Sequence, residues 1–559
     1  QQPTIKGLAD YIKKADEKNF VKIPPVPQRD FYEVSSAQKR LYMVQQIEGA
    51  ELAYNIPSSV RLSGPLDIAK LEKAIQSLVA RHESFRTSFH LIDGELMQKI
   101  HEEVDVSLAV IPCENIELEE RFHTFVRSFD LASAPLFRSE LLKLSENEHV
   151  LQLDMHHIVS DGTSMSVLFN GLMRLYDGDS LEPLSIQYKD YAIWQNKRLN
   201  SEELTKQKAY WMNQLSGDLP VLEMKTDYNR PAVQRFEGDH YGFELGKILT
   251  AKLNRLMKME NTTLYTTLLT AYNVLLHKYT GQEDIIVGSP VAGRLHADVD
   301  SIVGMFVNTL AIRTSLKRDA SFREYLQHVK ETVLQAHEHQ EYPFESLVDN
   351  LTLSRDLSRH PVFTTMFVLQ DIDLAGCLGK GIYYEHLNHD SGISKFDLLF
   401  SAISIEKNVF IEIEYTRSLF KLSTIKRMSN HFINLLHQVI DYYSKTLSDF
   451  KLTSTNEEDI ILQNFSTSLE PNLYSMSIVS QFEHLSLESG KDNAIHYLDK
   501  SLSFKTLNQR ANQLAHFLQK NGVGRETLVG IIADRSIDTV VAMLGILKAG
   551  GAYVPIDPS

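Results

Sequence analysis

Two adjacent histidines, followed at a fixed spacing by an aspartate and a glycine, form the part of the sequence best suited to proton transfer: His156-His157-Ile158-Val159-Ser160-Asp161-Gly162. An imidazole titrates near neutral pH, so it can take a proton from an amine or a thiol and return it. Neighbouring side chains of an extended chain point to opposite faces, so only one of the two histidines can face a given cavity. The other must support the scaffold.

The flanking residues predict that this segment is a turn between a strand and a helix. Residues 149–155 alternate in the manner of a strand, and apolar residues recur at helical spacing over 165–175. Gly162 keeps the turn free of a Cβ, while Asp161 could cap the helix, orient a histidine or pair with an arginine. The alternative is an ordinary exposed turn, although this spacing arises by chance in only about one chain in a thousand.

Length and composition restrict the class of protein. The 559 residues suggest three or four domains, and a hydrophobic content of 43% suits globular cores. The net charge of −15 argues against nucleic-acid or anionic membrane partners, and the longest apolar run, Val540 to Leu547, is too short to span a bilayer. Cys113 and Cys377 are far apart and outside any metal-ligand spacing, which favours a reduced, cytoplasmic protein. We expect no signal peptide at the N-terminus, and we expect this sequence to be part of a longer chain.

The order of expected elements predicts two α/β lobes of similar size, the first closing near residue 195 and the second running from about 200 to 450. In the first lobe we expect a helix over 66–82 and a hairpin at Asp93-Gly94. In the second, the pattern predicts helices at 263–279, 322–338 and 422–444, and strands at 284–288, 362–369 and 409–415.

Shorter segments flank the two lobes. Residues 3–15 predict one short helix, and a proline-rich linker follows it. Residues 451–475 are polar and predict a second linker. Residues 476–559 begin another α/β unit, with helices near 504–518 and 536–549 flanking a strand at 528–532. This unit is expected to end before its core is complete and before any glycine-rich phosphate loop, so we expect no amino-acid activation by this chain.

Six further stretches carry polar residues in unusual places for a core. Taken singly, each favours a structural role, because arginines beside aromatic rings usually pack and pair within a scaffold. They are Ser36-Ala37-Gln38-Lys39-Arg40-Leu41-Tyr42, Arg81 to Phe89, Tyr188 to Trp194, Val303 to Arg313, His339 to Glu345, and Arg355 to Pro361.

Together with the histidine turn, these stretches resemble, in order and spacing, the condensation domains of nonribosomal peptide synthetases. The resemblance covers about residues 31–450 and departs at Glu341, where that family usually has aspartate. Residues 3–15 resemble the last helix of a peptidyl carrier domain. The segments Leu502 to Leu507 and Leu547 to Pro555 resemble the start of an adenylation domain.

The resemblance implies an α/β fold with two lobes, each similar to chloramphenicol acetyltransferase, in a V-shaped pseudo-dimer, plus a truncated α/β segment at the C-terminus. The implied organisation is a carrier-domain helix at 1–20, a linker at 21–30, an N-lobe at 31–198, a C-lobe at 199–450, a linker at 451–475 and an adenylation-domain fragment at 476–559.

The implied activity is peptide-bond formation between two thioesters carried on phosphopantetheine arms. The α-amine of the acceptor attacks the thioester of the donor. The implied partners are an upstream donor carrier domain, a downstream acceptor carrier domain and the adjacent adenylation domain, with no nucleic acid and no membrane. The domain itself is expected to bind no cofactor, metal or nucleotide.

Mapped onto this sequence, the resemblance assigns His157 to the acceptor amine, either as a base or as the group that positions it. A free α-amine titrates at about 7.7–8.0, so part of it is neutral without help. His156, Asp161 and Gly162 complete the catalytic motif, with His156 and Asp161 expected to support the scaffold. Structural support is also expected from Arg294, as a candidate partner of Asp161, and from Asn308 and Arg86.

Four alternatives remain at this stage. An epimerisation domain shares the histidine turn, but the stretch around Asn308 resembles condensation domains instead. A heterocyclisation domain would have aspartates at the first histidine positions. A coenzyme-A-dependent acyltransferase does not account for the flanks, and a scaffold that only docks carriers does not account for an intact His157.

The first stretch, Ser36 to Tyr42, resembles that of domains joining an L-configured donor to an L-configured acceptor.

Overall fold

The computed structural model describes residues 22–558 apart from 48, 354–355, 371–374, 379–380, 388, 390, 406 and 466–475. The chain forms two compact units that divide after Ser454. The helix expected at 3–15, and with it the expected carrier-domain segment at 1–20, lies outside the described residues. Within them, no helix combines the length and apolar composition needed to cross a bilayer.

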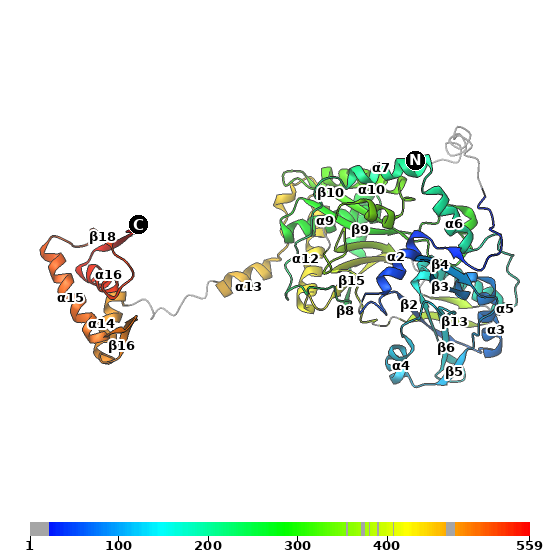
Figure 1. Cartoon of the computed structure of the whole chain (residues 1–559), viewed down its shortest axis with the longest axis horizontal. Helices are drawn as coiled ribbons and strands as arrows, with labels where there is room; N and C mark the ends of the chain where they lie inside the picture. The colour runs from blue at the N-terminus through cyan, green and yellow to red at the C-terminus, as the bar shows by residue number, and fades with distance from the viewer. Residues whose placement is uncertain are drawn as a thin grey trace. The chain divides into compact units, whose positions relative to one another are not determined.

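The first sheet of the larger unit has the strand order β12-β13-β2-β7-β6-β5 (Figure 1). Its central strands are β2 (Asn55–Ser63) and β7 (Glu148–His156), which pair antiparallel, and β6 (Phe137–Lys143) and β5 (Ala109–Pro112) follow on one side. Alternate residues of β7, Leu151, Leu153 and Met155, are buried in one apolar core with residues of α3 (Ile68–Arg81) and α5 (Gly162–Asp177). The helix expected at 66–82 is confirmed, and its last turn is shorter by one residue.

The second sheet of this unit has the order β10-β9-β11-β14-β15-β8. The strands are β8 (Gly238–Glu244), β9 (Asp284–Val291), β10 (Asn308–Ser315), β11 (Thr365–Gln370), β14 (Leu398–Ile405) and β15 (Asn408–Thr416). Helices α9 (Leu264–Thr280), α10 (Phe322–Glu338) and α12 (Leu422–Asp441) share its core. The three helices and three strands expected in this region are therefore confirmed, with α12 three residues shorter at its C-terminus. Both sheets are covered by helices, so the α/β class is confirmed.

One connection contradicts the expected boundary between the lobes. Strand β13 (Ile382–Leu387) pairs antiparallel with β2, and β12 (Ala375–Leu378) pairs with β13, so both strands belong to the first sheet. The C-lobe expected at 199–450 includes the residues of both strands. Alternation in a sequence predicts that a strand forms but not which sheet edge accepts it.

A smaller three-stranded sheet has the order β1-β4-β3, with β1 (Tyr32–Glu33), β3 (Thr87–Ile92) and β4 (Glu95–Ile100). Asp93 and Gly94 both have positive φ, at 53° and 85°. This is the backbone of a two-residue turn of the type that joins twisted strands, so the expected hairpin is confirmed.

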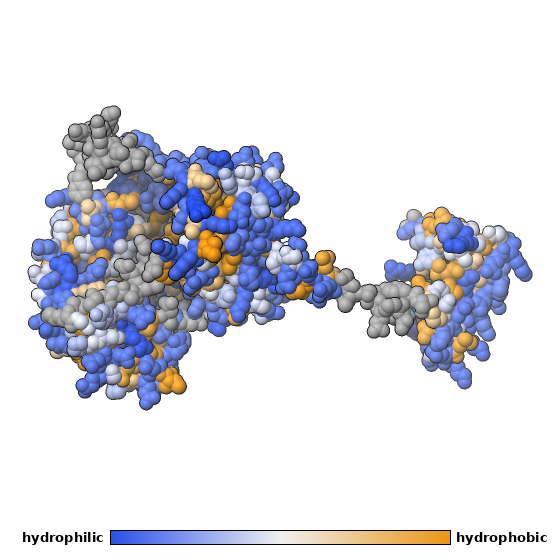
Figure 2. All heavy atoms as spheres, turned by 180° about the vertical axis from the view of Figure 1, so that it is seen from behind, coloured by the Kyte–Doolittle hydropathy of each residue, from blue (hydrophilic) through white to orange (hydrophobic). Residues whose placement is uncertain are grey.

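Hydrophilic side chains cover most of the face that Figure 2 shows, with smaller apolar patches between them.

The second unit contains the three elements expected for residues 476–559, namely α15 (Phe504–Lys520), β18 (Leu528–Ile532) and α16 (Ile537–Ala549). It also contains four elements that we did not predict, namely α14 (Ile478–Glu488), β16 (Asn493–Tyr497), β17 (Lys500–Ser503) and β19 (Ala552–Ile556). Strands β18 and β19 pair in parallel. Before them, α13 (Thr455–Phe465) occupies part of the segment that we expected to be a linker. Polar composition indicated a linker, yet Glu457 and Glu458 in its first turn favour a helix start.

Candidate active site

The histidine turn joins β7 to α5, as expected from the sequence. His156 is the last residue of β7, residues His157–Val159 form a single 3₁₀ turn, and Gly162 is the first residue of α5. Helix α2 (Ser36–Gln45) lies against this turn, where Gln38 Nε2 donates a hydrogen bond to Ile158 O at 3.4 Å. The first of the six further stretches therefore supports the turn directly.

His157 is held in one tautomer, in which Nδ1 makes a hydrogen bond and Nε2 makes none among the described residues. Its backbone N–H donates to Tyr54 O at 2.7 Å, and its Nδ1 lies 2.9 Å from Ser160 O. Because a carbonyl oxygen only accepts, Nδ1 carries the proton and Nε2 presents a lone pair. Burial of the ring, followed by the positive charge of Lys395, lowers the pKa of His157 to about 3. The imidazole is therefore a neutral hydrogen-bond acceptor at physiological pH.

His156 has both ring nitrogens engaged. Its Nδ1 accepts the Ile158 N–H at 3.1 Å, so its Nε2 carries the proton and donates to Gln45 Oε1 at 3.1 Å. The side chain is fully buried, and burial lowers its pKa to about 3, with a smaller effect from Lys395. These contacts support the expectation that His156 fixes the turn, while the second histidine faces outward.

The depressed pKa of His156 predicts a specific pH dependence of stability. Between pH 6.5 and about 3 the unfolded chain binds a proton at this ring and the folded chain does not, so the free energy of unfolding falls as the pH falls. One such group contributes about 1.4 kcal/mol per pH unit. The variant His156→Gln keeps an amide near Gln45 but cannot bind this proton. In denaturant titrations between pH 6 and 4, we expect the slope of its free energy of unfolding against pH to be smaller than that of the wild-type protein by the contribution of about one proton. Equal slopes in the two proteins would contradict the assignment.

Asp161 is completely buried and has three partners. Its Oδ1 caps α5 by accepting the Ser164 N–H at 2.7 Å and lies 3.2 Å from Arg294 Nη2, and its Oδ2 accepts the Phe306 N–H at 2.9 Å. Within the described residues it makes no hydrogen bond to either histidine. Of the three roles open from the sequence, the cap and the arginine pair are therefore present together, and the contact predicted between Asp161 and Arg294 is found.

Arg294 is itself enclosed, with 5% of its side chain exposed. Its Nη1 donates to Val299 O at 2.5 Å and Ile302 O at 2.8 Å, and its guanidinium lies 4.1 Å from the centre of the Phe306 ring. Gly293 precedes it with φ of +66°, and a Cβ there would lie 1.9 Å from Phe306 O. Only glycine permits this approach, so the residue before Arg294 sets where the arginine enters the core.

The remaining motif residues are placed as follows. Gly162 is exposed, and a Cβ added to it would meet nothing within 4 Å, so the space above the start of α5 is open. Asn308 Nδ2 donates to Gln340 O and Tyr342 O, both at 2.8 Å, and fixes the loop before α11 (Phe344–Asn350). Arg86 donates to carbonyl groups at the C-terminal end of α3 and to His101 O. Neither Asn308 nor Arg86 contacts the histidine turn within the described residues.

Two family models match this chain. The family model described as Condensation domain matches residues 28–462, and that described as AMP-binding enzyme matches residues 482–559. The chain belongs to the condensation-domain family. Condensation domains of nonribosomal peptide synthetases are amide-forming acyltransferases, so the chain belongs to that class of enzyme, and its last residues are the start of an adenylation domain.

Curated relatives of this condensation domain are large synthetases. The chain is 44% identical over 557 residues to bacitracin synthase 3 of Bacillus licheniformis, 43% identical over 560 residues to gramicidin S synthase 2 of Brevibacillus brevis and 43% identical over 562 residues to surfactin synthase subunit 1 of Bacillus subtilis. Each alignment covers 100% of this chain but only 9%, 12% and 16% of the respective relative.

Solved structures of related domains show the same fold. The X-domain in a complex with OxyB from teicoplanin biosynthesis matches with a TM-score of 0.72 and 26% identity, over 78% of this chain and 98% of that one. A four-domain nonribosomal peptide synthetase bound to AMP and glycine matches with a TM-score of 0.82 and 21% identity, over 98% of this chain and 43% of that one.

A cavity of about 1120 Å³ in the condensation domain is lined by Tyr54, whose ring contacts His157 edge to face, whereas none of residues 156–162 is part of its wall. Its wall includes α2, residues 95–97, α11 and the stretch 356–361, and Lys395 also lines it. Across this space, Arg40 of α2 pairs with Glu345 of α11 at 2.9 Å.

Sequence patterns did not identify Tyr54 or Lys395, because each is a single residue outside any stretch that we singled out. No group of three or more histidine, cysteine or acidic side chains among the described residues is arranged to hold a metal ion.

Proposed function

We propose that this condensation domain joins a donor thioester to the α-amine of an acceptor thioester and so forms a peptide bond. The observation that supports this most directly is His157, whose Nδ1 is fixed by Ser160 O while its Nε2 keeps a lone pair. A neutral imidazole in this state accepts an N–H from the attacking amine. Its low pKa argues that it positions the amine and receives a proton only as the new bond forms.

The substrates are proposed to arrive on phosphopantetheine arms of an upstream donor carrier domain and a downstream acceptor carrier domain. Family membership and the adenylation segment at 482–559 support this context. The cavity of about 1120 Å³ beside Tyr54 offers room for an acyl chain and part of an arm, since typical small-molecule sites enclose about 300–1,000 Å³.

Two other functions use the same fold. An epimerisation domain would move a proton at the α-carbon of one tethered residue and make no amide. A binding domain without catalysis is the other, and the X-domain bound to OxyB is an example of a structurally similar domain in a complex with another protein. The Nε2 of His157 makes no hydrogen bond among the described residues, so it is available to a substrate amine, and this favours catalysis over binding alone.

The deciding experiment is a single-turnover reaction with two loaded carrier domains. We expect an amide-linked product on the acceptor carrier and a free thiol on the donor carrier. A donor offered as a coenzyme A thioester tests the free acyltransferase alternative, and chiral analysis of the unreacted donor tests epimerisation. Absence of amide product with every pair in a panel of loaded carriers would overturn the proposal.

The same reaction tests stereochemical preference. We propose an L-configured donor and an L-configured acceptor, because Ser36 to Tyr42 resembles that type. A wrong stereocentre directs its side chain at a wall of the cavity and displaces the thioester from the amine. We expect the L-terminal donor to react about 10-fold or more faster than its D-epimer at matched concentrations. Equal or reversed rates would contradict this preference.

A further inference from the structure

Lys395 is a half-buried cation that makes no ion-pair contact among the described residues, and the carboxylate charge that acts on it, that of Glu414, does so from a longer distance. It lines the cavity of about 1120 Å³, and its Nζ lies 4.8 Å from the centre of the Tyr54 ring. Among the residues that the structure describes, its ammonium group makes no hydrogen bond and has no carboxylate within 4 Å. Two other cations of the cavity wall differ, since Arg40 lies 2.9 Å from Glu345 and Arg359 lies 3.4 Å from Asp356. An enclosed ammonium group that no carboxylate contacts is only partly compensated, so an anionic group of a substrate in the cavity would be attracted to it.

The Tyr54 ring connects this cation to the histidine turn. Tyr54 contacts His157 edge to face, with ring centres 6.4 Å apart, and its carbonyl accepts the His157 N–H. The positive charge of Lys395 is the second cause, after burial, of the lowered pKa of both His156 and His157. The ammonium group is therefore close enough to influence charge at the reacting centre.

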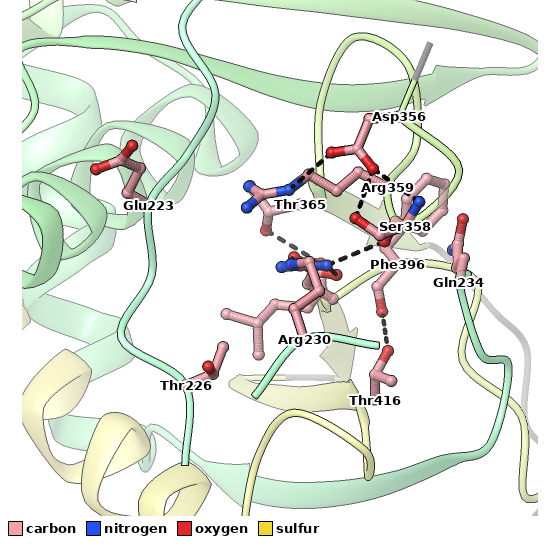
Figure 3. Close-up of polar contacts among 12 residues, drawn as sticks. Glu223, Thr226, Arg230, Gln234, Asp356, Ser358, Arg359, Thr365, Phe396 and Thr416 are labelled. Carbon is pink, nitrogen blue, oxygen red and sulfur yellow. Dashed lines mark hydrogen bonds and ion pairs between the residues drawn. The ribbon is translucent and has the colours of Figure 1, made fainter. Parts of the chain in front are cut away.

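The backbone that carries Lys395 is held from several sides, and Figure 3 shows neighbouring contacts of Arg230 with Ser358 and of Phe396 with Thr416. Gln234 Nε2 donates to Lys395 O at 2.9 Å, and the Lys395 N–H donates to Glu414 Oε1 at 3.3 Å. Two residues further on, Asp397 accepts two hydrogen bonds from Arg230, one of them 2.9 Å long. Arg230 also donates to Ser358 O at 3.2 Å, which ties in the stretch at 355–361. These contacts fix the backbone from which the Lys395 side chain extends, as is expected for a side chain that must be held in place to act on a substrate.

The proposed reaction creates a transient negative charge that needs such a group. The amine nitrogen attacks the thioester carbon, and the π electrons of the carbonyl move to its oxygen. The oxyanion then collapses, the C–S bond breaks, and the thiol leaves with the proton that the amine loses by way of His157. A fixed cation beside the oxygen lowers the energy of the tetrahedral intermediate, because it attracts the negative charge that develops there.

We propose that the Lys395 ammonium group stabilises the oxyanion that forms on the donor carbonyl during this transfer. This inference rests on the proposed function. The phosphodiester of a carrier arm is a second anion that this ammonium group would attract, so the test must separate the two anions.

The test compares Lys395→Met with the wild-type protein in single-turnover reactions. For the donor we use both a loaded carrier and an N-acetylcysteamine thioester, which contains no phosphate. Loss of the cation should lower the rate constant at saturating donor by about 10²-fold with both donors, as for removal of one oxyanion donor, and leave the half-saturating donor concentration within about twofold. Lys395→Arg should recover part of the rate.

A charge readout separates catalysis from packing. Lys395→Cys alkylated with 2-bromoethylamine restores an ammonium group at nearly the original length, and alkylation with iodoacetamide gives a neutral side chain. We expect recovery only with the former, while identical treatment of the wild-type protein controls for Cys113 and Cys377. Lys426→Met is the matched control, because Lys426 also lies over a tyrosine, 5.6 Å from the centre of Tyr241, but is exposed and away from the cavity.

The outcomes are distinguishable. A loss seen only with the phosphopantetheine-linked donor assigns Lys395 to the phosphodiester and overturns the oxyanion role. Full activity of Lys395→Met, or equal recovery with both alkylating reagents, also overturns it. Failure of the wild-type protein to form any amide would instead count against the proposed function itself.

Discussion

Replacing His157 by alanine is expected to lower the single-turnover rate of amide formation by about 10³-fold, within the range that a positioned acid or base contributes. The structural reason is the unused Nε2, which no described residue can replace. His156 cannot take over, because its two nitrogens are engaged by Ile158 and Gln45. The substitution should lower the rate constant at saturating donor and leave the half-saturating donor concentration unchanged, since His157 acts on the amine of the acceptor.

Stability provides the check on this variant. His157→Ala loses one hydrogen bond, from Nδ1 to Ser160 O, so we expect the free energy of unfolding to fall by only about 1 kcal/mol. His123→Ala is the matched control, because His123 is 56% exposed and pairs with Glu119 of its own helix, outside the histidine turn. A folded His157→Ala protein that transfers at a rate near that of the control would remove His157 from the mechanism.

Local patterns predicted the strand, turn and helix that carry the candidate site, because each of these elements is set by neighbouring residues. The alternation before His156 and the helical spacing after Gly162 are sufficient to define a strand, a turn and a helix. The contact between Asp161 and Arg294 spans 133 residues and was predicted only from the resemblance. Its physical basis, a buried carboxylate that must be compensated, becomes visible only once the burial of both groups is known.

Other features depend on tertiary structure and left no local signal. Strand β13 alternates like any other strand, and its place beside β2 depends on which sheet edge is free. Lys395 belongs to an ordinary strand-entry segment, and its importance comes from Tyr54, which lies 341 residues earlier and brings it to His157. Helix α13 was missed because polar composition was taken to indicate a linker, although its acidic first turn was already in the sequence.

Asp161→Ala is expected to lower the free energy of unfolding by about 3–5 kcal/mol, the cost of removing one partner from a buried ion pair. The substitution leaves the Arg294 guanidinium without its carboxylate at 5% exposure, and it leaves the Phe306 N–H without an acceptor. It also removes the cap of α5 at Ser164. These losses act together, because a single carboxylate meets all three groups.

A second capping aspartate in the same unit separates these contributions. Asp67 caps α3 by accepting the Lys70 N–H at 3.1 Å, but its side chain is 49% exposed and compensates no buried cation. Asp67→Ala should therefore cost only about 1 kcal/mol, the usual value of a helix cap. Asp161→Asn, which can still cap α5 but carries no charge, should lie between the two alanine variants. Denaturant unfolding of all three proteins measures the difference, and equal losses for Asp161→Ala and Asp67→Ala would show that the pair with Arg294 adds nothing to the cap.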